Sequence, residues 1–258
     1  MRQNHNARNL LLSILSVATI LSAWFVVTNV GLVSSKILPS PQDIINEVLK
    51  LLADGYTGKP LWTHVRASLV RTLTGLGAAM LVGIPIGLLV GRNQVIAALL
   101  NPIFSFLRPV PAIAFIPLII LYFGIGEFSK VMLIFVTATL YLILNTAAGA
   151  KSVPHDQIRA GLNMGLTQRQ LFVYVILPAS APYVMTGIKT ATAVSWALVV
   201  AAELVAAQEG LGYMIMDAAT FYRIPDVYIA IAIIGLIGLG LEIVETLAED
   251  RFIHWRGR

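Results

Sequence analysis

Long apolar runs without a single charge alternate with short polar segments along this chain. Residues 10–30, 72–91 and 131–150 carry no charged side chain. Each run is about as long as the 20 or so apolar residues that a helix needs to cross a bilayer. We expect three further spans near residues 103–123, 182–206 and 228–244, where prolines or single charges interrupt the run. The pattern predicts an all-α integral membrane protein with six transmembrane helices.

Prolines interrupt the third of these expected spans. Pro109, Pro111 and Pro117 lie in the stretch "RPVPAIAFIP". Each proline lacks a backbone N–H and therefore breaks or kinks a helix. We place this span at residues 103–123 and expect it to be irregular.

Composition agrees with a membrane protein. Of 258 residues, 57% are hydrophobic and 12% are charged, whereas soluble domains carry roughly 25% charged residues. The formal charge of +5 comes from basic residues that flank the apolar runs singly, so we interpret them as anchors at the membrane surface and expect no nucleic-acid partner. The chain has no cysteine, which excludes disulfides, thiolate metal sites and cysteine nucleophiles.

Six spans place both termini on the same side of the membrane. Lysine and arginine are somewhat more numerous on that side, and basic loops favour the cytoplasm. We therefore predict a cytoplasmic N-terminus at residues 1–9, a first span at residues 10–30 and an outer loop at residues 31–65.

The outer loop is expected to contain an amphipathic helix at residues 41–53. Ser40 is a natural N-cap, Pro41 fits the first helical position, and Asp43 suits the positive end of the helix dipole. Gly55 follows the apolar stripe and ends the helix. We expect it to lie along the membrane surface or on neighbouring spans.

Small residues recur every fourth position in the second span. This spacing places them on one helical face, where another backbone can approach closely. The contact is either within one subunit or between two subunits. The residues are Gly75, Ala79, Gly83, Gly87 and Gly91.

Polar residues within spans are costly in lipid and are therefore candidates for a translocation path. Lys189, Trp196 and Glu203 are spaced by seven and share one face of the fifth span. Lys189 and Glu203 would be roughly 21 Å apart on a continuous helix, too far to pair with each other. Hydrogen bonding between helices and snorkelling to the interface are the alternatives. The full candidate set is Asn145, Lys189, Ser195, Trp196 and Glu203.

Motifs of catalysis and metal binding are absent from the sequence. It contains no G-x-x-x-x-G-K-[ST] loop, no H-E-x-x-H and no G-x-S-x-G, and its four histidines are far apart. We therefore expect no catalytic residues, no metal site and no cofactor in this chain.

The segment "RAGLNMGLTQRQLFVYVILP" from Arg159 to Pro178 separates two spans on the side of the termini. Pro154 can open a short helix, and Gly165 is a good terminator. Thr167 and Gln170 form a capping box for a second helix, which we expect to end at Pro178. The segment is typical of a handle for a soluble partner, and a surface-lying linker is the alternative.

This segment resembles the EAA loop of the inner-membrane permease subunits of binding-protein-dependent ABC importers. That motif is E-A-A, three residues, G, nine residues, then I-x-L-P. Arg159 stands where the family has Glu, and Gly161 where it has Ala. The resemblance implies an ATPase-coupling helix within a coupling loop at residues 151–178, with its contact residues at Arg159, Ala160, Gly161, Leu162, Gly165, Thr167, Val175, Leu177 and Pro178.

The resemblance extends over most of the chain and implies a biological unit. "LRPVPAIAFIPLIILYFGIGEFSK" and "WALVVAAELVAAQEGLGYMI" look like the branch of taurine, sulfonate, nitrate and bicarbonate permeases. This implies the type I importer permease fold with a core at residues 66–258, in the inner membrane of a bacterium. It also implies a second copy of the permease, two ABC ATPases that bind ATP and Mg, and a periplasmic substrate-binding protein.

Substrate identity depends on local similarity alone. "LWTHVRAS" and "VAAELVAAQEGLGYM" are most similar to taurine permeases, so taurine or another alkanesulfonate is the expected solute. Nitrate, bicarbonate and an aromatic carboxylate are alternatives within the same importer class. An energy-independent channel or carrier and a membrane enzyme are the alternatives from other classes.

Overall fold

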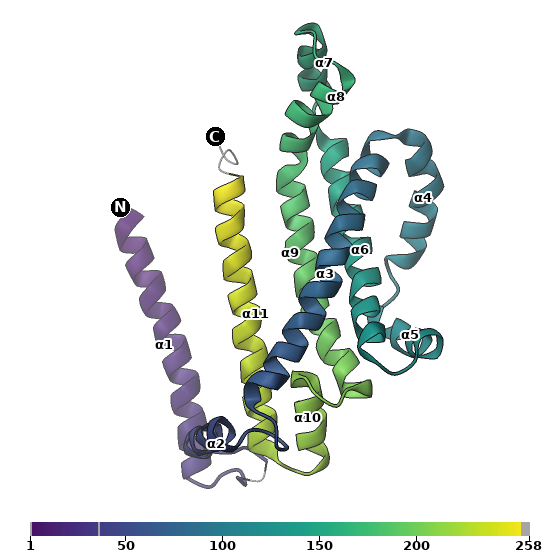
Figure 1. Ribbon diagram of the computed structural model, residues 1–258. Helices are drawn as coiled ribbons and strands as arrows, with labels where there is room; N and C mark the ends of the chain where they lie inside the picture. The colour runs from purple at the N-terminus through teal and green to yellow at the C-terminus, as the bar shows by residue number, and fades with distance from the viewer. Residues whose placement is uncertain (1, 36, 254–258) are drawn as a thin grey trace. The chain divides into compact units, whose positions relative to one another are not determined.

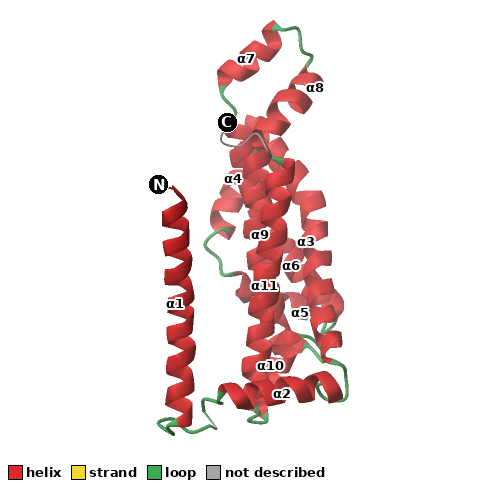
Figure 2. Ribbon diagram, turned by 90° about the vertical axis from the view of Figure 1, so that its left-hand side faces the viewer, coloured by secondary structure: helices red, strands yellow, loops and turns green. Residues whose placement is uncertain are grey.

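The computed structural model describes residues 2–35 and 37–253, and regular structure within these ranges is helical (Figure 2). The chain divides into two compact units. One comprises Met1–Thr63 with Met214–Ala232, and the other comprises His64–Tyr213 with Ile233–Arg258. The principal helices, labelled in Figure 1, are α1 (Arg2–Asn29), α2 (Pro41–Asp54), α3 (Leu61–Arg92), α4 (Gln94–Leu107), α5 (Ile116–Phe123), α6 (Glu127–Ser152), α7 (His155–Asn163), α8 (Gln168–Leu171), α9 (Leu177–Ala206), α10 (Leu211–Thr220) and α11 (Ile224–Phe252).

Five helical stretches are long and apolar enough to cross a membrane. They include α1, α3, α6, the stretch through α8 and α9, and α11. A sixth span is obtained if α4 and the bent helix that follows it count as one. The α1 stretch Leu11–Asn29 has none of its residues buried. A helix that is apolar on all sides is suited to lipid or to another apolar surface.

The predicted amphipathic helix is present as α2, with the expected cap. Ser40 Oγ accepts a hydrogen bond from the Asp43 amide at 3.2 Å, and Asp43 Oδ2 accepts one from the Ser40 amide at 3.0 Å. The Ser40 hydroxyl also donates to Asp43 Oδ2 at 2.8 Å, and this bond, together with the one from the Ser40 amide, lowers the pKa of Asp43 because both favour the charged carboxylate. Helix α2 ends at Asp54, and Gly55 follows it with φ of 75°.

Tyr56 fixes the end of the α2 segment to α10 within the first unit. Its side chain is buried, its hydroxyl donates to Asp217 Oδ2 at 2.8 Å, and it accepts from Arg223 Nη2 at 2.8 Å. The Arg223 guanidinium also lies 4.6 Å from the centre of the tyrosine ring. Burial raises the pKa of the Tyr56 phenol, and the hydrogen bond to Asp217 raises it further, so the hydroxyl remains a donor.

The small-residue face of α3 packs against α6 within the same chain. A Cβ added at Gly87 would lie 2.6 Å from Thr146 Cβ, and one added at Gly91 would lie 2.6 Å from the Ala147 carbonyl oxygen. Gly75 and Gly83 make similarly close contacts with α6. This answers the question left open by the sequence, because the backbone that approaches this face belongs to the same subunit.

Helix α9 packs on another side of α6 by the same device. A Cβ at Gly149 would meet the Tyr183 side chain, and one at Gly187 would lie 2.9 Å from Asn145 Cβ. Helix α6 therefore lies between α3 and α9, with close backbone approaches to each.

The break that the prolines predict in the third span is confirmed, but the expected start of this span at residue 103 is wrong. The helix begins earlier, at Gln94, and breaks after Leu107, and the segment Ala112–Phe123 is bent by 93° from it. Pro109 and Pro111 lie in the break, where two missing N–H groups prevent the helix from continuing. Pro117 does not break α5, because it occupies one of the first two helical positions.

The expectation that the second helix of the 159–178 segment ends at Pro178 is also wrong. Helix α8 leads into a π-helical turn at Phe172–Ile176, which leads directly into α9. The Leu177 amide bonds to the carbonyl of Phe172, five residues back. This wider turn lets the helix continue through a proline that has no N–H to donate. The fifth span therefore begins before residue 182.

Two glycines of α3 give a matched test of this packing. Gly87→Ala places a methyl group against Thr146 and the Ile143 carbonyl, and overpacking of this kind costs about 1–3 kcal/mol. Gly77→Ala meets no atom within 4 Å and improves helix propensity by up to about 1 kcal/mol. We expect Gly87→Ala to lower the thermal unfolding temperature of the detergent-purified protein and Gly77→Ala to leave it unchanged or raise it. Equal effects of the two would contradict the packing described.

Candidate functional site

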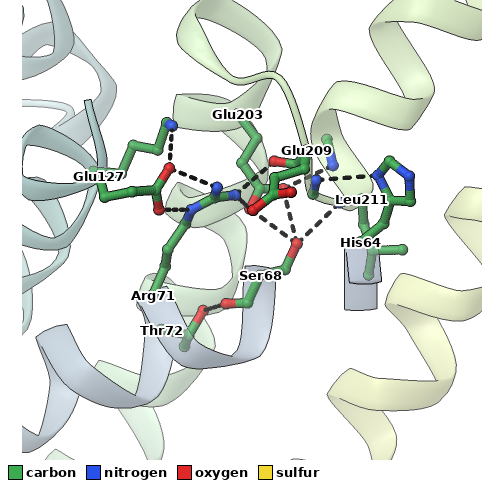
Figure 3. Close-up of polar contacts among 11 residues, drawn as sticks. His64, Ser68, Arg71, Thr72, Glu127, Glu203, Glu209 and Leu211 are labelled. Atoms are coloured by element: carbon green, nitrogen blue, oxygen red, sulfur yellow. Dashed lines mark hydrogen bonds and ion pairs between the residues drawn. The ribbon is translucent and has the colours of Figure 1, made fainter. Parts of the chain in front are cut away.

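A buried cluster of ionic side chains joins α3, α6 and α9 near the residues that precede α10 (Figure 3). Arg71 of α3 lies at its centre. Its Nε and Nη2 donate to the two carboxylate oxygens of Glu127 at 2.5 and 2.7 Å. Its Nη1 donates to Glu203 Oε1 at 2.6 Å and to the Glu209 carbonyl at 2.7 Å. A planar guanidinium with several donors suits this arrangement, whereas a lysine could not make the paired contacts with Glu127.

The Glu203 carboxylate is enclosed by hydrogen-bond donors at the end of α9. Besides Arg71, it accepts from Ser68 Oγ and from the Gly212 amide, each at 2.9 Å. A Cβ at Gly212 would lie 2.7 Å from Glu203 Cβ, and one at Gly210 would overlap the carboxylate itself. Gly210 also has a φ of 127°, a conformation that L side chains rarely adopt. The two glycines therefore let the backbone wrap closely around a buried acid.

Three polar side chains of α3 face this cluster because they are spaced by four and three residues. His64, Ser68 and Arg71 are all buried. The amides of Gly210 and Leu211 donate to His64 Nδ1 at 3.3 Å and to Ser68 Oγ at 2.9 Å. One face of α3 therefore holds both the Glu203 carboxylate and the loop that precedes α10.

The cluster is electrically balanced and has one open edge. Lys130 Nζ lies 2.9 Å from Glu127 Oε1, so two cations face the two carboxylates of Glu127 and Glu203. The side chain of Glu127 is 64% exposed, whereas those of Arg71 and Glu203 are 2% and 0% exposed. Removing one member of a buried pair leaves an uncompensated charge, which costs about 3–5 kcal/mol. The cluster is suited to holding three helices in one arrangement.

The residues predicted to line a path do not gather at one place. Glu203 belongs to the cluster just described. Lys189 instead bonds to Glu249 Oε2 at 2.6 Å and to Thr246 Oγ1 at 3.3 Å, both on α11. The prediction that Lys189 and Glu203 do not pair is confirmed by these separate partners.

The other three residues predicted to line the path lie within the packed helices. Trp196 Nε1 donates to the Ile234 carbonyl at 3.0 Å, and the amide of Asn145 bonds to the Tyr141 carbonyl of its own helix at 2.8 Å. Ser195 is buried, and its Oγ has no hydrogen-bond partner among the described residues. These contacts match the alternative of hydrogen bonding between and within helices for Trp196 and Asn145.

Arg71, Ser68 and Glu127 were missed by the sequence reasoning. A second span that begins at residue 72 leaves Arg71 outside it as a surface anchor, and its partners lie 56 and 132 residues away in the sequence. A local signal did exist, since His64, Ser68 and Arg71 form a polar stripe at helical spacing in "THVRASLVRT".

Helices α7 and α8 form a hairpin beyond the adjoining ends of α6 and α9 (Figure 2). Its residues Val153, Leu171 and Ile176 form a small core, on which Ile158 and Val175 pack. Thr167 and Gln170 form the expected capping box, in which the Thr167 amide donates to Gln170 Oε1 at 2.9 Å.

The two glycines of the hairpin serve different purposes. Gly165 has a φ of 82°, and a Cβ there would meet nothing within 4 Å, so the backbone conformation rather than a lack of space favours glycine. Gly161 is buried, and a Cβ there would lie 2.8 Å from Leu171 Cδ1. This close approach gives a physical reason for glycine at a position where the EAA motif has alanine.

Comparison with known proteins identifies the family of this chain. Residues 83–254 match the family described as "Binding-protein-dependent transport system inner membrane component". The chain belongs to this family. The match covers more than half of the chain and includes α6, the α7–α8 hairpin and α9, while Arg71 and Ser68 lie before it.

Relatives and solved structures agree with this family. The chain is 37% identical over 252 residues to the taurine transport system permease protein TauC of Escherichia coli (strain K12), covering 97% of this chain and 92% of that protein. It is 34% identical over 210 residues to the nitrate import permease protein NrtB of Synechocystis sp. (strain ATCC 27184 / PCC 6803 / Kazusa), covering 80% and 76%. Its fold is similar to a chain of the MetNI methionine ABC transporter in an inward-facing conformation, with TM-score 0.62, 20% identity, and coverage of 77% of this chain and 96% of that one.

These similarities identify the role of the chain but not its solute. It is a permease subunit of an ABC importer with the type I permease fold, and it is not itself an enzyme. The expectation of an all-α permease is confirmed, whereas the solute is not fixed, because both a taurine and a nitrate permease are among the relatives.

The ion cluster predicts a large difference between two arginines of α3. In Arg71→Met, Glu203 stays buried without its guanidinium partner, which costs about 3–5 kcal/mol. Arg66 is exposed five residues earlier, and Arg66→Met is expected to change stability by less than about 0.5 kcal/mol. We expect a clear fall in unfolding temperature or in the yield of monodisperse permease only for Arg71→Met. An Arg71→Met permease as stable as the Arg66→Met control would show that the cluster contributes little.

Proposed function

We propose that this permease subunit carries a small organic sulfonate, with taurine as the first candidate, into the cytoplasm in an ATP-driven importer. The observation that carries this choice is the 37% identity to TauC over 97% of the chain. In the proposed assembly, two copies of the permease form the path, and a periplasmic binding protein delivers the solute. Two ABC ATPases bind ATP and Mg and supply the energy. The termini and the α7–α8 hairpin lie on the cytoplasmic side.

We propose that α7 is the coupling helix that contacts the ATPase. The hairpin core of Val153, Leu171 and Ile176 supports this assignment, because a packed and capped hairpin moves as one body. Arg159, Ala160 and Leu162 are exposed on α7, and Met164 beyond it is 82% exposed. Arginine and methionine are enriched at protein interfaces. A positive Arg159 where the EAA motif has Glu favours an acidic partner on the ATPase surface.

The hairpin is well placed to pass a displacement into the spans. The π turn at Phe172–Ile176 joins α8 to α9 without a loop, and α6 leads into α7 through Val153 and Pro154. Close backbone contacts at Gly149 and Gly187 hold α6 and α9 together. Packed helices shift as discrete units rather than deforming gradually, so movement of the hairpin is expected to reach both helices.

Of the residues predicted for the path, Lys189 is the one we retain. Its side chain is 30% exposed, although its ammonium group pairs with Glu249 at 2.6 Å. A partly accessible cation within a span suits the attraction of an anionic group. Glu203 is fully enclosed by Arg71, Ser68 and Gly212, so we assign it to the stability of the helix arrangement.

The coupling proposal predicts opposite outcomes for two substitutions of Gly165. The backbone at position 165 is left-handed, a conformation that is unfavourable for valine and tolerated by asparagine. Strain of about 1–2 kcal/mol would reshape the hairpin, so Gly165→Val is expected to reduce ATP-driven uptake roughly tenfold. Gly165→Asn should remain near the unmodified level. Uptake is measured in proteoliposomes with the cognate ATPase and binding protein, together with co-purification of the ATPase.

The coupling proposal fails if Gly165→Val transports and binds the ATPase as well as Gly165→Asn does. A loss of uptake in both variants would also count against it, because glycine would then be needed for something other than backbone conformation.

The sulfonate proposal predicts a selective uptake profile for the complete importer. Radiolabelled taurine should accumulate only with ATP and the binding protein, and excess unlabelled alkanesulfonate should compete. Nitrate and bicarbonate in equal excess should not compete. Saturable import of nitrate with no import of taurine would replace the sulfonate by nitrate while leaving the importer class intact.

A further inference from the structure

A cavity of about 760 Å³ lies between the C-terminal end of α3, the first part of α4 and the C-terminal end of α6. These segments lie at the same end of the second unit, next to the point where α6 leads into α7 (Figure 1). The ion cluster and the predicted path residues lie elsewhere, since none of them lines this cavity.

Basic side chains from three segments converge on this cavity. Arg92 ends α3, Lys151 is in the last turn of α6, and His155 begins α7. The residues that line the cavity include no carboxylate. An anion that entered it would therefore meet two permanent positive charges and a third group that can carry one.

The two cations of the cavity differ from the cations discussed above. Arg71, Lys130 and Lys189 each form an ion pair with a glutamate. In the described part of the chain, neither Arg92 nor Lys151 forms an ion pair or side-chain hydrogen bond. Both side chains are exposed, so their charges are available to a ligand from outside the chain.

The remaining lining suits an amphipathic ligand. Gln94 and Asn101 of α4 contribute amide groups that donate hydrogen bonds to oxygen atoms. Val90, Leu144 and Ala147 supply an apolar wall. A volume of about 760 Å³ exceeds that of a phosphate group alone and leaves room for what the phosphate is attached to.

We propose that this cavity binds a phosphate group, carried either by the headgroup of an anionic phospholipid or by free phosphate. Basic pockets between membrane-spanning helices at a membrane surface are suited to phosphate headgroups. Arginine and lysine are the side chains that pair best with phosphate oxygens, arginine through two parallel hydrogen bonds. The bound phosphate would link the turn between α3 and α4 to the junction of α6 and α7. The binding site itself does not rest on the proposed solute or on the proposed coupling role.

The test uses the full-length permease purified in a non-ionic detergent. Native mass spectrometry measures the binding of two lipids, anionic phosphatidylglycerol and zwitterionic phosphatidylcholine. Equilibrium dialysis without lipid measures the binding of radiolabelled inorganic phosphate. The double substitution Arg92→Gln with Lys151→Gln removes both charges. The matched control, Arg66→Gln with Arg108→Gln, removes two exposed arginines that do not line the cavity.

We expect the cavity double variant to lower the affinity for the phosphate-bearing probe by about 10- to 30-fold. The control pair should change it by less than about twofold. The charge-conserving pair Arg92→Lys with Lys151→Arg should retain most of the binding and shows whether a loss comes from charge rather than misfolding.

Each outcome decides the proposal. Loss confined to phosphatidylglycerol assigns the site to a lipid headgroup, and loss of inorganic phosphate binding in the absence of lipid assigns it to free phosphate. The proposal is overturned if the cavity double variant binds both probes as the unmodified protein does. Equal losses in the control pair and the cavity pair would overturn it as well.

Discussion

The guanidinium of Arg71 contacts groups from three other segments of the chain, and its buried positive charge is balanced by two carboxylates among them. It donates to Glu127 of α6, to Glu203 of α9 and to the carbonyl of Glu209 before α10. The pairing is neutral when Lys130 is included, so no member of the cluster is left as an uncompensated buried charge. Because these three partners lie 56, 132 and 138 residues from Arg71 in the sequence, the cluster favours this arrangement of the helices.

Close packing and the ion cluster join the helices through different residues of α3. Gly83, Gly87 and Gly91 bring α3 against α6 with no side chain of α3 between them, and close packing of this kind is one of the attractions that hold helices together in lipid. The hydrogen bonds of Arg71 fix how α3 is aligned along α6 and α9, which apolar packing alone specifies weakly. Together they join α3, α6 and α9 into one packed set of helices. The α7–α8 hairpin is attached to this set at two points, through α6 and α9.

Local signals in the sequence predicted local structure well. The caps at Ser40 and Thr167 were found because each depends on residues three positions apart. Apolar run length found the long spans, but it could not show that Pro109 and Pro111 turn the chain by 93°. The sequence did not predict the π turn before Pro178. In this turn the Leu177 amide bonds five residues back, so the helix continues although Pro178 has no N–H to donate. Partners of Arg71 lie 56 and 132 residues away, so only tertiary structure could identify the cluster.

The claim that Arg71 and Glu203 act as one buried unit is tested most directly by a double-mutant cycle. Unfolding free energies are measured for Arg71→Met, Glu203→Gln and the double variant in the same detergent. Each single change disturbs the charge balance of the cluster, whereas the double variant replaces the buried pair by two uncharged side chains. We predict strong non-additivity, with a coupling energy of about 0.5–3 kcal/mol and a double variant more stable than the sum of the single losses implies. Additive effects within about 0.5 kcal/mol would contradict the claim and make the two residues independent.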